Sequence, residues 1–140
     1  MQVKSFLGGF DKNFSYLIWC NKTNEAAIID PAIEINPILK IINIKNLNLR
    51  KIFITHTHHD HIKHLKDFQV YNPQIEVIGH SKSLKKIEGN YLGVNDGSKV
   101  TLGKNLITII HTPGHYADSI CMWVKNSNYL FTGDTIFVGR

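Results

Sequence analysis

Apolar residues occur along this chain in short runs separated by polar, turn-forming positions. Runs rich in β-branched and aromatic residues predict strands over 3–7, 14–19, 26–29, 51–54, 76–78, 108–111, 119–124 and 129–131. Between residues 35 and 44 the apolar positions recur at helical spacing instead, which predicts a helix. Further helices are expected from residue 62 onward and shortly after residue 81. Together these elements predict an α/β (α+β) fold, in which helices flank mixed sheets.

The strand at 51–54 leads directly into an unusual concentration of histidine. Residues 55–61 read Thr-His-Thr-His-His-Asp-His. Extended backbone places this whole group within roughly 20 Å. Neutral imidazole is the commonest protein ligand for zinc, and it suits iron as well. Because alternate residues of an extended segment point to the same side, His56 and His58 can reach one ion while Thr57 points away.

The rest of this segment falls where the next helix is expected to begin, and the helix dipole favours a carboxylate at that position. The ligands predicted from the segment are His56, His58, Asp60 and His61. The neighbouring His59 is expected to face away from the metal. Isolated histidines are usually surface residues or hydrogen-bonded core residues, and that is the expectation for His64, His80 and His111.

Two later turns offer further ligands. Residues 112–115 read Thr-Pro-Gly-His after an apolar strand, so His115 is expected on a turn at the edge of a sheet. Residues 132–135 read Thr-Gly-Asp-Thr at the end of another predicted strand, which places Asp134 at a similar edge. Either turn alone would be weak evidence. Beside the histidine cluster, both side chains are predicted as metal ligands.

Thr-His-x-His-x-Asp-His at 55–61 is the signature of the metallo-β-lactamase fold superfamily, which this chain resembles. Asp30-Pro31, Pro113-Gly114-His115 and Gly133-Asp134-Thr135 resemble further motifs of that family and follow in its order. The resemblance extends from about residue 14 to residue 140 and is greatest to the glyoxalase II and persulfide dioxygenase branches. It implies an αββα sandwich with an incomplete second half, formed as one domain over residues 1–140.

The resemblance implies a metal-dependent hydrolase with two zinc ions. His56, His58 and His115 would hold the first ion and leave an open position, as in catalytic zinc sites. Asp60 and His61 would bind the second ion, and Asp134 would bridge the two. Hydroxide formed there would attack a thioester or ester, and Asp60 would orient it as a catalytic residue. The expected substrate is a small anionic thioester such as a glutathione conjugate.

Other functions stay open at this point. One iron could be held by His56, His115 and Asp134, a facial triad of two histidines and one carboxylate, as in persulfide dioxygenases. Mixed occupancy by zinc, iron and manganese is also compatible with these ligands. The family's final histidine has no counterpart within this sequence, which leaves the second site with fewer ligands and the sheet edges exposed. Self-association, or metal binding without turnover, is therefore a further alternative, whereas β-lactamase activity is not expected.

Composition narrows the setting of this chemistry. The 140 residues are 43% hydrophobic and 19% charged, as expected for a globular protein, and the net charge of +5 suits an anionic substrate. The sequence lacks the basic stripe interleaved with aromatic residues that would favour nucleic-acid binding. It also has no apolar run long enough to span a membrane. The N-terminal stretch lacks the apolar run of a secretory signal, so a cytoplasmic location is expected. Cys20 and Cys121 are expected to be small buried thiols.

Overall fold

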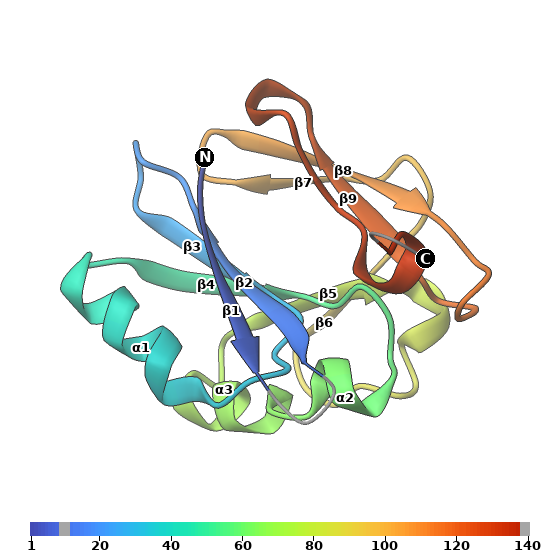
Figure 1. The fold of residues 1–140 in the computed structure, drawn as a ribbon, viewed down its shortest axis with the longest axis horizontal. Coiled ribbons are helices and arrows are strands. Elements are labelled where there is room, and N and C mark those ends of the chain that lie inside the picture. Colours follow the sequence, from blue (N-terminus) through green and yellow to red (C-terminus); the bar gives the residue numbers. More distant parts are fainter. Residues whose placement is uncertain (9–11, 138–140) are drawn as a thin grey trace.

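The computed structural model describes residues 1–8 and 12–137 and contains two sheets that face each other (Figure 1). Strands of the first sheet lie side by side in chain order, antiparallel from β1 to β3 and parallel from β3 to β6. They are β1 (Gln2–Gly8), β2 (Asn13–Trp19), β3 (Glu25–Ile29), β4 (Asn48–Phe53), β5 (Glu76–His80) and β6 (Tyr91–Val94). The second sheet is antiparallel in the order β10-β9-β8-β7. It consists of β7 (Lys99–Leu102), β8 (Asn105–His111), β9 (Ile120–Val124) and β10 (Tyr129–Phe131).

Helices cover the face of the first sheet that points away from the second (Figure 1). The α-helices are α1 (Ile35–Ile44), α2 (His59–Ile62) and α3 (Leu65–Tyr71), and short 3₁₀ turns form η1 (Ser81–Ser83), η2 (Lys125–Ser127) and η3 (Gly133–Thr135). In α1 the buried residues are Ile38 and Ile42, one turn apart, so one side of the helix packs on the sheet. Among the described residues, no helix combines the length and the apolar character that crossing a membrane requires.

Strands β3 and β4 lie in the middle of the first sheet and are buried on both faces. Ile28 and Ile52 point toward the helices, while Ile29 and Phe53 point into a second apolar core between the two sheets. This double burial explains why residues 26–29 and 52–54 are continuous apolar runs rather than alternating ones. Fully burying side chains of this size contributes about 1.5–3 kcal/mol each.

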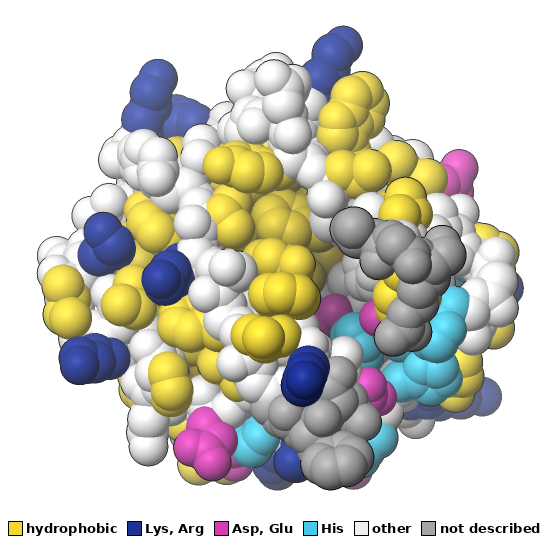
Figure 2. All heavy atoms as spheres, in the orientation of Figure 1, with side chains coloured by type: hydrophobic (Ala, Val, Ile, Leu, Met, Phe, Trp, Pro, Cys, Tyr) yellow, Lys and Arg dark blue, Asp and Glu magenta, His cyan; other side chains and the backbone are white. Residues whose placement is uncertain are grey.

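The predicted class and sandwich architecture are confirmed, with a difference after the histidine cluster. The helix expected from residue 62 begins at His59, ends at Ile62 and resumes as α3 at Leu65. Cys20 and Cys121 are buried and free, as expected. Figure 2 shows apolar side chains gathered between the two sheets and histidines gathered near α2.

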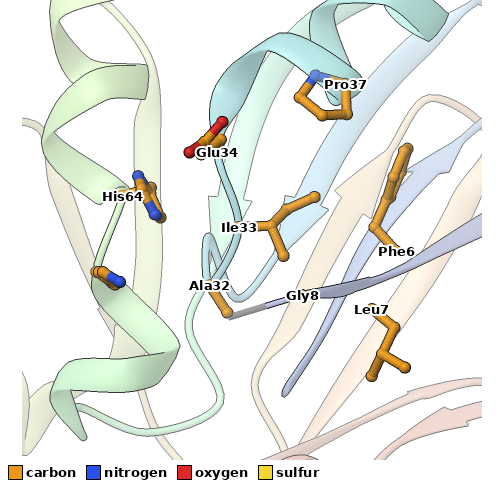
Figure 3. A pocket seen from close by; sticks show the side chains of 9 residues that line it. Phe6, Leu7, Gly8, Ala32, Ile33, Glu34, Pro37 and His64 are labelled. Atoms are coloured by element: carbon orange, nitrogen blue, oxygen red, sulfur yellow. The ribbon is translucent and has the colours of Figure 1, made fainter. Parts of the chain in front are cut away.

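Loops that follow β4, β8 and β10 meet at one end of the sandwich. The backbone links the first of them to the second sheet, because Ile120 N–H donates to the Thr55 carbonyl at 2.8 Å. Residues that include Phe6, Ile33, Glu34, Pro37 and His64 line a surface pocket of about 370 Å³ beside α1 (Figure 3). The clustered histidines lie where the loops that follow β4, β8 and β10 meet, so the candidate site is at that end of the sandwich.

Candidate metal centre

Asp30 fixes the loop that carries the histidines. Its carboxylate accepts hydrogen bonds from Thr55 N–H at 2.7 Å and from the Thr55 hydroxyl at 2.6 Å. Asp30 itself has a left-handed backbone, with φ of 51°, and its carbonyl accepts a hydrogen bond from Ser15 Oγ. It is 3% exposed, so these bonds form away from bulk water, where a buried carboxylate needs them.

This network also decides which nitrogen of two histidines faces the site. Thr55 Oγ1 donates to Asp30, so its oxygen accepts from Nδ1–H of His56, 3.1 Å away. His61 Nδ1 lies 2.8 Å from Asp30 Oδ2 and donates to it. Both rings therefore present the lone pair of Nε2, which is the form of histidine that binds a metal.

At His61 this lone pair meets only acceptors. Its Nε2 is buried and has no hydrogen-bond partner in the part of the chain that the structure describes. It lies 3.2 Å from Asp134 Oδ1 and 3.8 Å from Asp60 Oδ2. A nitrogen lone pair and two carboxylate oxygens repel one another unless a cation or a proton lies between them. This donor set fits a metal ion with nitrogen and oxygen ligands.

Three other imidazole nitrogens converge on a neighbouring point. His58 Nδ1 lies 2.9 Å from both His56 Nε2 and His115 Nε2. The ring of His58 is nearly perpendicular to the other two, at 79° and 89°. In a tetrahedral zinc site with Zn–N bonds of 2.0–2.1 Å, ligand nitrogens lie roughly 3.3 Å apart. A small outward movement of these rings would accommodate a zinc ion.

Asp134 lies between the two groups. Its Oδ1 faces His61, and its Oδ2 lies 3.4 Å from His115 Nε2. Among residues 1–8 and 12–137, two sets of side chains can hold a metal, with ligand atoms within 4.8 Å of one another, and His56 belongs to both. They are His56, His58 and His115, and His56, His61 and Asp134. The two oxygens of one carboxylate therefore face the two groups of histidines.

Burial and nearby charges shift the pKa values of His56 and His61 in opposite directions. Burial, followed by the charge of His61, lowers the pKa of His56 to about 4, so His56 is neutral at physiological pH. Burial acts in the same direction on His61, but the hydrogen bond and charge of Asp30 and the charges of Asp134 and Asp60 outweigh it and raise its pKa. At His61 a proton and a metal ion would compete for the same lone pair.

Five of the six predicted ligands come together, and the sixth lies beside them. The five are His56, His58, His61, His115 and Asp134. Asp60 lies at the rim of the site, where Asn13 Nδ2 donates to it at 2.5 Å. Burial raises the pKa of Asp60, but the Asn13 hydrogen bond, a backbone hydrogen bond and the nearby charges of His61 and His56 together outweigh it and hold the pKa below its usual value. Asp60 is thus ionised at neutral pH and can orient a water molecule from one side by accepting a hydrogen bond from it.

The remaining histidines lie outside both groups. His59 is exposed, as expected of the variable position of the motif. His64 Nδ1 lies 2.9 Å from Asp67 Oδ2, and His80 stacks on His111 with ring centroids 4.0 Å apart. These contacts match the ordinary structural roles predicted for them.

Sequence reasoning assigned no role to several side chains that shape the site. Asp30 had a usable signal, because a carboxylate directly after a buried strand and before proline needs a structural reason. Tyr116 had none, although its ring centroid lies 4.2 Å from that of His58. Asp118 also had none, although it binds Thr57 of the histidine loop.

Comparison with known proteins shows which family shares this sequence and fold. The family model described as the metallo-beta-lactamase superfamily matches residues 8–140. A hydroxyacylglutathione hydrolase of Pseudoalteromonas translucida is 34% identical over 139 residues, which are 99% of this chain and 52% of that protein. The BLEG-1 B3 metallo-beta-lactamase superposes with a TM-score of 0.85 at 23% identity, covering 97% of this chain and 73% of that one. ETHE1 from Myxococcus xanthus superposes with a TM-score of 0.83 at 29% identity, and the match covers 99% of this chain and 59% of that one. The chain spans about half the length of the curated relatives it matches.

Proposed function

Since this chain belongs to the metallo-beta-lactamase superfamily, we propose that its histidine-rich centre binds two zinc ions and hydrolyses a thioester or ester. The observation that carries the proposal is the position of Asp134, whose two oxygens face the two groups of histidines. Two metal ions about 3.5–4 Å apart can act together in hydrolysis, and a carboxylate between two ligand sets can hold two ions close to each other. The curated relatives named hydroxyacylglutathione hydrolase support the same reaction class.

In this proposal, His56, His58 and His115 would hold one ion, and His61 and Asp60 would hold the other, with Asp134 shared between them. Bound zinc would supply a nucleophile at neutral pH by lowering the pKa of water from its bulk value of about 15.7. Asp60 orients that nucleophile, since its carboxylate lies at the rim and Asn13 fixes its direction. Asp30 keeps His61 in the required tautomer.

The proposed substrate is a small anionic thioester such as an S-acyl glutathione. A thiolate is a tolerable leaving group, because thiols have a pKa of about 8.5 and need little help from an acid. The net charge of +5 favours the approach of an anion. The names of the relatives support glutathione as the thiol.

A mono-iron oxidoreductase of the persulfide dioxygenase type is the second candidate. His115 Nε2 lies 3.4 Å from Asp134 Oδ2, and His56 shares a ligand group with His115. These three side chains would form a facial triad, which is typical of non-haem iron oxygenases. This alternative needs neither Asp60 nor His61 as a ligand.

The test is to load the purified chain with zinc or with ferrous iron, measure metal stoichiometry, and assay S-acyl glutathione hydrolysis beside persulfide-dependent oxygen uptake. We expect two zinc ions and hydrolysis. His58→Ala should abolish hydrolysis, whereas the adjacent exposed His59→Ala should retain it. Oxygen uptake with one iron would support the second candidate. A fully metal-loaded chain that cleaves no thioester would contradict the hydrolase.

A further inference from the structure

We propose that Asp118 is a positioning residue of the metal centre, which locks the loop carrying His56 and His58 to the loop carrying His115. It is not itself a ligand. The inference rests on the proposed metal centre and is independent of the reaction catalysed there. It is carried by the contacts of Asp118 with three other segments of the chain.

Asp118 is 1% exposed and accepts hydrogen bonds on both carboxylate oxygens. Oδ2 accepts from the Thr57 hydroxyl and from the Ser83 hydroxyl, each at 2.5 Å, and Oδ1 accepts from Thr57 N–H at 3.3 Å. Hydrogen bonds to a charged acceptor contribute more than neutral ones. A buried carboxylate with this many donors is held in one orientation.

Thr57 is the residue through which this orientation reaches the metal ligands. It lies between His56 and His58, and its side chain points to the opposite side of the loop. Asp118 binds both its hydroxyl and its N–H, so the backbone between the two histidines is held from behind. Small rotations of that backbone would move both imidazoles away from a shared ion.

The same carboxylate also supports the outer side of His58. Lys86 Nζ lies 3.5 Å from Asp118 Oδ2, 3.0 Å from Thr57 Oγ1 and 4.7 Å from the centroid of the Tyr116 ring. The Tyr116 ring in turn lies 4.2 Å from that of His58. Asp118 therefore contacts the histidine loop directly and through a lysine and an aromatic ring.

The position of Asp118 in the chain makes it a link between the two sheets. His115, Tyr116 and Asp118 share the connection between β8 and β9 of the second sheet. Thr57 follows β4 of the first sheet, and Ser83 belongs to η1, which follows β5. One carboxylate thus joins the segments that present His58 and His115, whose nitrogens lie 2.9 Å apart.

A purely structural role for Asp118 would make a different prediction. If it served only to satisfy Ser83 and Lys86, its loss would lower stability and leave metal affinity unchanged. Groups that orient metal ligands typically change metal affinity by about 10–100-fold when they are removed. Metal affinity, measured on folded protein, therefore separates the two roles.

The experiment titrates Co²⁺ into the metal-free chain at neutral pH, with affinity measured by chelator competition and geometry by the visible absorption of the bound ion. For Asp118→Asn we expect affinity to fall by about 10–100-fold, with an altered absorption spectrum. Thr57→Val, which keeps the shape and the N–H but removes the hydroxyl, should show a smaller change in the same direction. Their effects should not add in the double variant, because both act on one contact.

Asp67→Asn is the matched control, because it removes an exposed carboxylate that pairs with His64 outside the site. Its Co²⁺ affinity should equal that of the parent chain. If Asp118→Asn does not fold, Thr57→Val decides. Variants that lose stability but bind Co²⁺ as tightly as the parent, with the same spectrum, would overturn the positioning role alone. A parent chain that binds no metal would overturn the proposed function as well.

Discussion

At the scale of single residues, one buried carboxylate sets the direction of two proposed metal ligands. Asp30 binds His61 directly and reaches His56 through the Thr55 hydroxyl, so both rings present Nε2 to the site. The aligned lone pairs face Asp134 and His58 rather than water. Geometry that is fixed before the metal arrives lowers the cost of binding it.

His80 gives a residue-scale prediction that involves no metal ligand. It is buried, and its Nδ1 accepts a hydrogen bond from Lys82 N–H, so that nitrogen carries no proton. Burial, followed by the nearby charges of His111 and Lys82, lowers its pKa below the usual 6.5. In the unfolded chain His80 takes up a proton at higher pH than in the folded protein. Its contribution to stability is therefore present above pH 6.5 and is lost as the pH falls below that value.

The measurement is urea unfolding of the metal-free chain at pH 7 and pH 5. The parent should lose more unfolding free energy between these values than His80→Gln does. The exposed His59→Gln should behave as the parent. An identical pH dependence in the parent and in His80→Gln would show that this ring does not titrate on unfolding.

At the scale of elements, the sequence pattern predicted those helices and strands whose bounds depend on local sequence. The helix at Ile35–Ile44 has the predicted bounds because its apolar positions recur at helical spacing. The strand at Tyr129–Phe131 also has the predicted bounds, because it is a short apolar run preceded by turn-forming residues. Strands β6 and β7 were not predicted individually, since four residues give little periodicity and their pairing partners supply the rest. Placing all ligands at strand ends was likewise predictable. The contacts of the Asp30 and Asp118 side chains were not, because they join residues 25 to 61 positions apart in the chain.

Gly133 gives an element-scale prediction about the turn that presents Asp134. It has φ of 49°, and a Cβ there would lie 2.5 Å from Thr55 Oγ1 and 2.7 Å from Thr55 Cβ. Gly133→Ala would therefore meet backbone strain of about 1–2 kcal/mol and overpacking of about 1–3 kcal/mol. The turn can relieve the clash only by moving Asp134 or the Thr55 network.

Gly97 is the matched control, because it has φ of 74° and a Cβ added there would meet nothing within 4 Å. Gly97→Ala should lose only the backbone contribution to unfolding free energy and should keep full metal stoichiometry. Gly133→Ala should be less stable still and should lose metal from the site that includes His61. Equal stability and equal metal content in the two variants would contradict a tight approach between this turn and Thr55.

At the scale of the whole molecule, the candidate metal centre joins the two sheets. His56, His58 and His61 follow β4 of the first sheet, whereas His115 and Asp134 follow β8 and β10 of the second. The convergence of these loops depends on how the sheets pack on the core between them, which no local pattern encodes. The sheets also end in edge strands, among them β1 and β10, so self-association stays a prediction.

Because its ligands come from both sheets, a bound metal should stabilise the molecule as a whole. An ion that binds only the folded chain adds about 2.7 kcal/mol at a concentration 100 times its Kd and about 4.1 kcal/mol at 1,000 times. The Tm of the parent chain should therefore rise with zinc concentration and fall back when a chelator is added. His58→Ala and Asp134→Ala should lose most of this rise, whereas His59→Ala, one residue from His58, should keep it. Calorimetric scans across a zinc series provide the measurement. A Tm that does not depend on zinc in the parent chain would mean that the loops from the two sheets do not share an ion.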